Sequence, residues 1–309
     1  MLTDRRTLIG GMAALGASAC VPIHERSDPS LTADLSRIER RTGGRLGVGF
    51  LDPGSGATMG LHSDERFPMA STFKTSLAAL TLVRAQDGAI DLDEEVRWSA
   101  DDLLSYAPFA RERIATGASW RELARAAQIL SDNTAANLLL AKLGGPAALT
   151  AFWRGIGDDI SRLDRIEPEL NNVPTGEWRD TTTPAAMAQT IARLVASPDS
   201  SPLSPGSADT LRDWMVATET GLRRVRAGLP ATWLAGDKTG NSGDWDGMGY
   251  TRGDIGFCRG PASQPICFAI YHQAPVDGTS DALRIDTAFA EVGEVLAGWV
   301  RRNYTIIVT

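Results

Sequence analysis

Strand-like segments lie at both ends of this 309-residue chain, and helical segments fill the middle. Apolar runs bounded by Gly and Pro turns predict strands at 45–52, 58–62, 232–238, 248–258 and 265–272. Apolar residues three and four apart predict helices at 31–41, 71–86, 120–130, 133–143, 146–156, from 184, at 208–218 and at 281–301. Because strands must pair to bury their apolar faces, the two ends are predicted to share one antiparallel sheet of about five strands.

This pattern predicts the α+β class, in the form of a two-lobed α/β sandwich with helices flanking the sheet. Residues 31–65 and 213–309 are expected to form the sheet lobe, and residues 66–212 an inserted all-α lobe. Residues 161–182 of the second lobe have no steady hydrophobic period and are rich in charge, Asn and Pro. We expect a long surface loop there, and long loops without regular structure are usually functional or disordered.

The N-terminus has the character of a targeting segment. Arg5-Arg6 precede a small, apolar run from Leu8 to Ala19, and Ala17-Ser18-Ala19 offers a cleavage site. The twin arginine resembles a Tat signal, so residues 1–19 are predicted to be an export signal, residues 20–30 a linker, and the mature protein periplasmic. The apolar run is too short for a transmembrane span. Cys20 follows the cleavage site, which leaves lipidation at Cys20 open beside simple release.

Charge and residue usage exclude several other classes. A net charge of −7 without a basic stripe argues against a nucleic-acid partner. The scattered His24, His62 and His272 give no metal-ligand spacing, so no metal or other cofactor is expected. Cys258 and Cys267 flank a Gly/Pro turn between two predicted strands, and both a disulfide and two buried thiols remain open. Nothing in the pattern indicates more than a monomer.

The first of four short motifs is Ser71-Thr72-Phe73-Lys74. Residues one helical turn apart share a face, so the Lys74 amine can reach the Ser71 hydroxyl. Serine becomes a strong nucleophile only when a neighbouring base takes its proton, and burial lowers the pKa of a lysine toward that role. The alternative is a helix N-cap with a lysine that reaches solvent.

The second motif, Ser131-Asp132-Asn133, offers a proton relay and an amide. Ser131 can pass a proton between Lys74 and a departing nitrogen, and Asn133 can bind substrate. Alternatively, Ser131 caps the helix that begins near Asn133.

The third motif, Glu167-Pro168-Glu169-Leu170-Asn171, lies in the 161–182 loop. A carboxylate and an amide that converge on one water make a general base for hydrolysis, whereas most loop glutamates are simply solvated. Arg165 and Asp180 are placed to pair and close the loop.

The fourth motif, Lys238-Thr239-Gly240, ends an apolar run and is expected at a strand edge. Lys238 and Thr239 can bind a carboxylate together, and Gly240 lets a substrate approach the backbone closely. The backbone N–H groups of Asn241 and Ser71 would form an oxyanion hole.

In this order, the four motifs resemble those of class A serine β-lactamases over about 31–301. The resemblance implies that Ser71 is acylated, Lys74 transfers protons, Ser131 protonates the leaving nitrogen, and Glu167 activates the deacylating water. It also implies substrate-binding roles for these residues: Asn133, Asn171, Lys238, Thr239, Asn241, Arg224 and Tyr106. The implied activity is hydrolysis of a small β-lactam substrate, a penicillin or a cephalosporin, and resistance to it.

The resemblance leaves some points open. It implies a cis Glu167–Pro168 peptide and an arginine for the substrate carboxylate, for which Arg224 is preferred over Arg252. An extended hairpin around 243–248 departs from the common pattern and makes the Arg252 alignment uncertain. The β-lactam spectrum and the base for acylation are not determined.

Two other functions share most of the motifs. A penicillin-binding DD-peptidase has the Ser-x-x-Lys and Lys-Thr-Gly patterns but lacks Glu167 in its setting, and therefore a fast route to deacylation. A non-hydrolytic β-lactam sensor would need a transmembrane span or a signalling domain, and the sequence indicates neither.

Overall fold

The computed structural model describes residues 28–197, 200–243, 245–260, 265–276 and 281–304. The predicted export signal and Cys20 lie outside these ranges.

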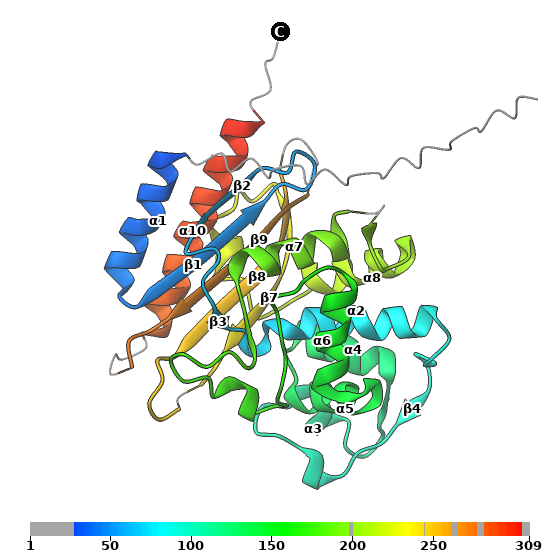
Figure 1. The fold of residues 1–309 in the computed structure, drawn as a ribbon. Coiled ribbons are helices and arrows are strands. Elements are labelled where there is room, and N and C mark those ends of the chain that lie inside the picture. The colour runs from blue at the N-terminus through cyan, green and yellow to red at the C-terminus, as the bar shows by residue number, and fades with distance from the viewer. Residues whose placement is uncertain (1–27, 198–199, 244, 261–264, 277–280, 305–309) are drawn as a thin grey trace, which may run out of the picture.

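A five-stranded antiparallel sheet forms the centre of the molecule, in the order β2-β1-β9-β8-β7 (Figure 1). Its strands are β1 (Arg45–Leu51), β2 (Thr58–Leu61), β7 (Leu234–Asn241), β8 (Thr251–Arg259) and β9 (Pro265–Gln273). Strand β1 pairs with β9 along its whole length, from Arg45 opposite Gln273 to Leu51 opposite Cys267. The predicted α+β class, with a sheet built from both ends of the chain, is therefore confirmed.

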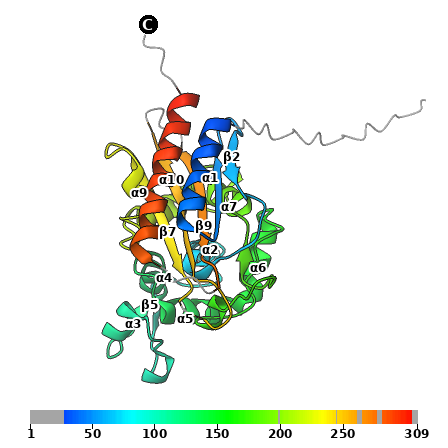
Figure 2. The same ribbon diagram turned by 90° about the vertical axis from the view of Figure 1, so that its left-hand side faces the viewer.

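One face of the sheet is covered by the first and last helices, α1 (Pro29–Thr42) and α10 (Ala282–Asn303). They lie side by side across the sheet in both views (Figures 1 and 2). Leu35 of α1 and Leu296 of α10 are fully buried there, in one cluster with Phe50 of β1. The ring of Trp299 lies 6.0 Å from that of Phe50, so the end of the chain packs directly on its beginning.

The opposite face is covered by α7 (Pro184–Val195), which contacts β1, β8 and β9. Beyond it lies the helical part, built around α2 (Phe73–Gln86), whose residues 73–82 are all buried. A helix apolar on every side needs neighbours on every side. They are α4 (Trp120–Ile129), α5 (Asn133–Leu143), α6 (Gly145–Gly155) and α8 (Pro205–Val216).

Short elements complete the fold. They are β3 (Phe67–Pro68), β4 (Glu95–Val96), α3 (Pro108–Glu112), β5 (Ala118–Ser119), β6 (Thr181–Thr182), α9 (Val225–Gly228) and the 3-10 turns Ala70–Thr72, Ala100–Asp102 and Glu169–Asn171. No single described helix has the length and apolar character of a membrane span; α5 and α6, bent by 76° at their junction, satisfy those criteria only as a pair.

Several boundaries differ from the prediction by one to three residues, and three of the starts have a visible cause. The helix expected from residue 71 starts at Phe73, because Ala70–Thr72 form a 3-10 turn instead. The helix expected from residue 208 starts at Pro205, since the Ser204 side chain caps its N-terminus. The strand expected from residue 248 starts at Thr251, where the amide N–H of Ser242 bonds to the Thr251 carbonyl (2.9 Å) and closes the 242–250 hairpin.

The two cysteines of the sheet are free thiols. Cys258 lies opposite Ile266, and Cys267 opposite Phe257. Residues directly opposite share a face and successive residues alternate, so the two thiols point to opposite faces of the sheet. Cys258 packs toward α1 and α10, and Cys267 toward the helical part. The disulfide left open by the sequence is excluded by this register.

Candidate active site

The side chain of Ser71 is presented by a tight turn at the start of α2. Ala70 has a left-handed backbone (φ 44°), an uncommon conformation for a residue with a Cβ that often marks a functional site. The turn packs on β7, where a Cβ added to Gly240 would lie 2.8 Å from the Met69 carbonyl oxygen. Gly240 is therefore required by the protein's own packing, and its role in the approach of a substrate stays a prediction.

Lys74 is fully buried and has four acceptors around its ammonium. Its Nζ lies 2.8 Å from Ser71 Oγ, 2.5 Å from Asn133 Oδ1, 3.0 Å from the Ser131 carbonyl and 2.9 Å from Glu167 Oε1. A protonated lysine has only three N–H donors. One of these close acceptors must therefore go without an N–H, an arrangement suited to moving protons among the groups.

Glu167 joins this centre from the 161–182 loop. Its carboxylate accepts a hydrogen bond from Ser71 Oγ (3.3 Å) and, through Oε2, from Asn171 Nδ2 (2.6 Å). The Glu167–Pro168 peptide is cis, as the resemblance implies. The sequence did not single out Asn137, whose side chain accepts from the Glu167 N–H (3.0 Å) and donates to its carbonyl (2.9 Å). Its position four residues after Asn133, on the same face of α5, was the available signal.

The loop is closed at its base by Arg165 and Asp180, as the sequence suggested. Arg165 Nε lies 2.5 Å from Asp180 Oδ2, and Asp180 Oδ1 accepts from the backbone N–H groups of Asp164 (2.7 Å) and Arg165 (3.0 Å). Burial raises the pKa of Asp180, although all three of these hydrogen bonds act to lower it.

Ser131 lies between two buried lysines. Its carbonyl accepts from Lys74, and its hydroxyl accepts from Lys238 Nζ at 2.9 Å. Burial, and then the charge of Lys74, hold the pKa of Lys238 well below its usual value. The alternative of a helix cap at Ser131 is wrong, because Asp132 caps α5 through a bond from the Ala135 N–H (2.8 Å).

Both candidate arginines meet the same two acceptors. Arg224 reaches Asn241 Oδ1 (2.6 Å) and Asp286 Oδ1 (2.9 Å), and Arg252 reaches the same oxygens at 3.3 and 3.4 Å. Both arginines are buried, and neither lines the cavity above Ser71, whereas Asn241 does. Both guanidinium groups therefore bond to the same amide oxygen, that of Asn241.

That cavity has a volume of about 300 Å³. Of the predicted residues it is lined by Ser71, Tyr106, Ser131, Asn133, Glu167, Asn171, Thr239 and Asn241. Lys74 and Lys238 lie buried beneath it. The cavity is also lined by five residues that no sequence motif indicates: Ser105, Thr220, Ser242, Trp245 and Tyr250. Thr220 bonds to Thr239 Oγ1 (2.6 Å), an anchor that no short motif signals.

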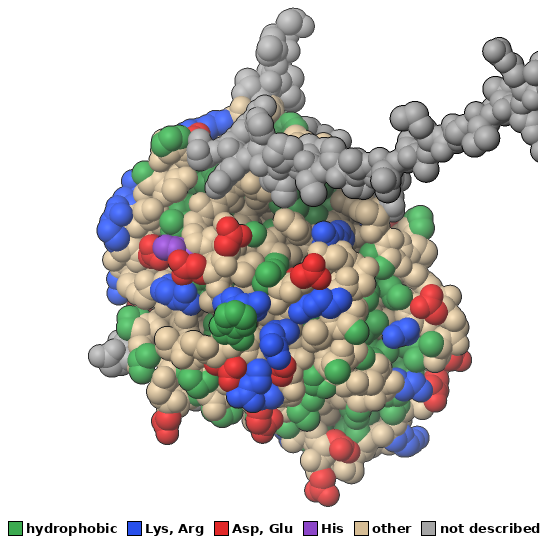
Figure 3. Space-filling view, viewed as in Figure 1, with side chains coloured by type: hydrophobic (Ala, Val, Ile, Leu, Met, Phe, Trp, Pro, Cys, Tyr) green, Lys and Arg blue, Asp and Glu red, His purple; other side chains and the backbone are tan. Residues whose placement is uncertain are grey.

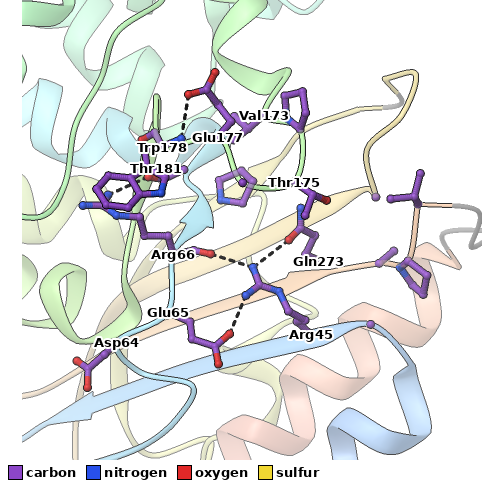
Figure 4. Close-up of a pocket in the computed structure, with 18 residues that line it drawn as sticks. Arg45, Asp64, Glu65, Arg66, Val173, Thr175, Glu177, Trp178, Thr181 and Gln273 are labelled. Carbon is purple, nitrogen blue, oxygen red and sulfur yellow. Dashed lines mark hydrogen bonds and ion pairs between the residues drawn. The ribbon is translucent and has the colours of Figure 1, made fainter.

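The structure has a second, larger cavity of about 780 Å³ (Figure 4). Val173 lines it, and the Val173 N–H bonds to Met248 Sδ (3.1 Å). In its wall, Arg45 bonds to Glu65 and Gln273, as Figure 4 shows. On the face in Figure 3, Lys and Arg side chains are mixed with Asp and Glu. This cavity holds none of the predicted site residues, so chemistry rather than size identifies the site.

The described residues contain no group of three or more His, Cys, Asp or Glu side chains that could hold a metal ion. The buried lysines, the serines and the Glu167 carboxylate are instead the groups of a nucleophilic, proton-transferring site.

Comparison with known proteins gives a consistent result. The model of the Beta-lactamase enzyme family matches residues 30–300. Beta-lactamase L2 of Stenotrophomonas maltophilia is 45% identical over 256 residues, 79% of this chain and 84% of that protein. The carbapenem-hydrolyzing beta-lactamase KPC of Klebsiella oxytoca is 41% identical over 240 residues, 78% of this chain and 80% of its own.

Solved structures agree with these relatives. The class A beta-lactamase of the last common ancestor of Gram-negative bacteria matches with a TM-score of 0.82 and 46% identity, over 88% of this chain and 99% of that one. PenP of Rhodopseudomonas palustris, a putative class A beta-lactamase by its description, matches with a TM-score of 0.81 and 43% identity, over 87% and 99%.

Proposed function

Because this chain belongs to the class A β-lactamase family and is a hydrolase of that class, we propose that it opens the β-lactam amide of penicillins and cephalosporins through an acyl-enzyme on Ser71. The observation that carries the proposal is the set of contacts around Ser71 Oγ, which lies 2.8 Å from Lys74 Nζ and 3.3 Å from Glu167 Oε1. A serine hydroxyl between a buried amine and a buried carboxylate has a nearby acceptor for its proton.

In the acylation step, Ser71 Oγ attacks the lactam carbonyl carbon and its proton passes to Lys74 or Glu167. The backbone N–H groups of Ser71 and Asn241 stabilise the oxyanion. When the C–N bond breaks, Ser131 gives its proton to the departing nitrogen. Lys238 supports that role because its ammonium, 2.9 Å from Ser131 Oγ, stabilises negative charge on the hydroxyl.

In the deacylation step, Glu167 takes a proton from a water molecule whose oxygen attacks the ester, and Ser71 leaves with a proton. Asn171, bonded to Glu167 Oε2 at 2.6 Å, fixes the carboxylate and offers a second contact to the water.

The test is hydrolysis of a chromogenic cephalosporin, counted in equivalents per enzyme. We expect many turnovers for the parent, none for Ser71→Ala, and a burst near one equivalent for Glu167→Ala, with a covalent adduct visible by intact mass. A parent that stops at one equivalent would instead be a penicillin-binding protein or a sensor. A Glu167→Ala variant that turns over at the parental rate would disprove the role of Glu167.

We propose further that the protein is exported to the periplasm, where β-lactams meet their targets. Support comes from Arg5-Arg6 ahead of the apolar run from Leu8 to Ala19. Arg5→Lys together with Arg6→Lys should shift the activity from the periplasmic to the cytoplasmic fraction. An unchanged distribution would rule out the twin-arginine route. Metabolic labelling with palmitate distinguishes a lipid on Cys20 from simple release.

A further inference from the structure

The cavity of about 780 Å³ takes no part in the chemistry proposed above, yet it has the size of a ligand-binding site. Pockets that bind small molecules have volumes of roughly 300–1,000 Å³ and combine apolar walls with a few polar groups. One wall here is the segment 173–178 of the loop that carries Glu167, and another is formed by residues 273–276, from the end of β9 onward. Pro68 adds apolar surface. The other groups that line the cavity decide which ligand fits it.

Trp178 presents an aromatic ring to solvent in a fixed position. The residue is 62% exposed, but its N–H donates to Glu177 Oε1 (2.9 Å) and its carbonyl accepts from the Thr181 hydroxyl (2.6 Å). The guanidinium of Arg66 lies 4.9 Å from the centre of the ring, and Figure 4 shows the two side chains together. Arg66 therefore covers one face of the indole, and the other face is open to a ligand. Because the ring is already held, binding loses little free energy to ordering it.

The guanidinium of Arg66 has one edge free. Its Nη1 donates to the Ile160 carbonyl (3.1 Å) and to Thr181 Oγ1 (2.9 Å). Its Nε and Nη2 have no acceptor among the residues that the structure describes, and neither atom is buried. These two N–H groups lie on one edge of the planar guanidinium, an edge that can bind both oxygens of a carboxylate.

The charge of Arg66 is not paired with a carboxylate in the described part of the chain. Three acids line the cavity without bonding to it: Glu65 and Glu177 are paired with other arginines, and Asp64 is exposed. Burial lowers the pKa of Arg66, and the charges of two nearby arginines lower it further, against a smaller opposite effect of Asp158. The surroundings of Arg66 therefore favour the binding of an anion.

Two further polar groups of the cavity are free to bind a ligand. Gln273 Oε1 accepts from Arg45 Nη2 (3.0 Å), whereas Gln273 Nε2 has no acceptor among the described residues. The hydroxyl of Thr175 has no hydrogen-bond partner among them either. A flat apolar ring would remove water from both groups without replacing it, at a cost in free energy. Hydroxyl groups donate and accept, so a polyhydroxylated ligand satisfies them.

We propose that this cavity binds an acidic saccharide, whose pyranose ring packs on the open face of Trp178 while its carboxylate bonds to the free edge of Arg66. The C–H groups on one face of such a ring are apolar and meet the indole, which offers a large apolar surface. Its hydroxyls meet Gln273 and Thr175. This binding site is additional to the β-lactamase function and does not depend on it.

The experiment compares two sugars that differ in one group. N-acetylmuramic acid is N-acetylglucosamine with an added lactyl ether, which carries a carboxylate. Titrations followed by saturation-transfer NMR measure the affinity of the full protein for each sugar. We expect the acidic sugar to bind about tenfold more tightly.

Three variants assign the contacts. Trp178→Ala should weaken the binding of both sugars about tenfold, and Arg66→Gln should remove the preference for the acidic one. Leu222→Ala is the matched control, because Leu222 is 63% exposed and does not line the cavity. It should leave both affinities unchanged. If Trp178→Ala loses its folded structure, Trp178→Leu takes its place, since leucine keeps apolar bulk without a flat face.

Each other outcome overturns the proposal. They are no binding of either sugar at millimolar concentrations, equal affinities for the two sugars, and unchanged affinities in Trp178→Ala. Phenylacetate tests the other ligand class that has a ring and a carboxylate. If it binds more tightly than N-acetylmuramic acid, the site takes aromatic acids instead of saccharides. None of these titrations involves a β-lactam, so their result and the test of the proposed function are independent.

Discussion

At the scale of single residues, the buried carboxylate beside Lys238 has the most unusual environment. Asp237 has no exposed side-chain surface, and Arg226 Nε lies 3.1 Å from its Oδ2. Asp254 lies diagonally across β8 on the same face of the sheet. Burial raises the pKa of Asp237 to about 6, and burial together with the charge of Asp237 raises that of Asp254 well above its usual value.

This environment predicts a stability that depends on pH. In the folded protein the pKa of Asp237 lies above the ordinary value of 3.8. The stability that proton binding by Asp237 contributes is therefore complete below pH 3.8 and is lost as the pH rises through about 6. Relative to the parent, the free energy of unfolding of Asp237→Asn should therefore increase between pH 4 and pH 7. Denaturant titrations at several pH values measure the difference. A difference for Asp237→Asn that does not change with pH would contradict the assignment.

The proximity of residues was predicted well where a motif joins them and poorly where the fold does. The four motifs brought Ser71, Lys74 and Glu167 together correctly, because each carries its own chemistry. Asn137 was missed, since its bonds go to the backbone of a loop that is distant in sequence. The choice between Arg224 and Arg252 had no single answer, as both act on Asn241.

At the scale of elements, the loop from 161 to 182 depends on the ion pair at its base. Arg165→Ala would leave the buried carboxylate of Asp180 without its cation, at a cost on the order of 2 kcal/mol in unfolding free energy. Because the loop carries Glu167, kcat should fall as well. Denaturation and steady-state kinetics measure the two effects.

Arg179→Ala is the control within the same loop. Its pair with Glu177 is mostly exposed, and surface pairs contribute less than about 1 kcal/mol. If Arg165→Ala and Arg179→Ala lost similar amounts of unfolding free energy, the buried pair would be no more important to stability than the exposed pair.

Long helices were predicted to within three residues at either end, because many turns repeat one hydrophobic period. The stretch from 87 to 119 was not resolved by the sequence, since its elements are only two to five residues long. They hold together through single contacts, such as the bond from the Trp98 indole N–H to the Ala110 carbonyl (3.0 Å), which leave no periodic signal.

At the scale of the whole molecule, the two chain ends stabilise the sheet through their packing on β1, while Asp286 of α10 also bonds to the arginines that hold Asn241. Leu296→Ala removes a fully buried side chain of α10 and should lower the unfolding free energy by about 2–5 kcal/mol. The activity per folded molecule should remain, because Leu296 packs in the cluster that contains Phe50 of β1, whereas the sheet residues that line the cavity belong to β7. Leu283→Ala, on the same helix but 67% exposed, should cost less than about 0.5 kcal/mol. A loss of kcat in Leu296→Ala at temperatures where it is folded would contradict this separation.

The sheet order has a consequence for folding during synthesis on the ribosome. Strand β1 lies between β2 and β9, and 213 residues separate Leu51 from Pro265, where β9 begins. Ribosomes add roughly 5–20 residues per second, so tens of seconds pass between the synthesis of β1 and that of β9, its second partner strand. Strand β7, which carries Lys238, is also made late. A nascent chain stalled before residue 234 should therefore expose β1 to proteases and bind no β-lactam, however complete its helices are.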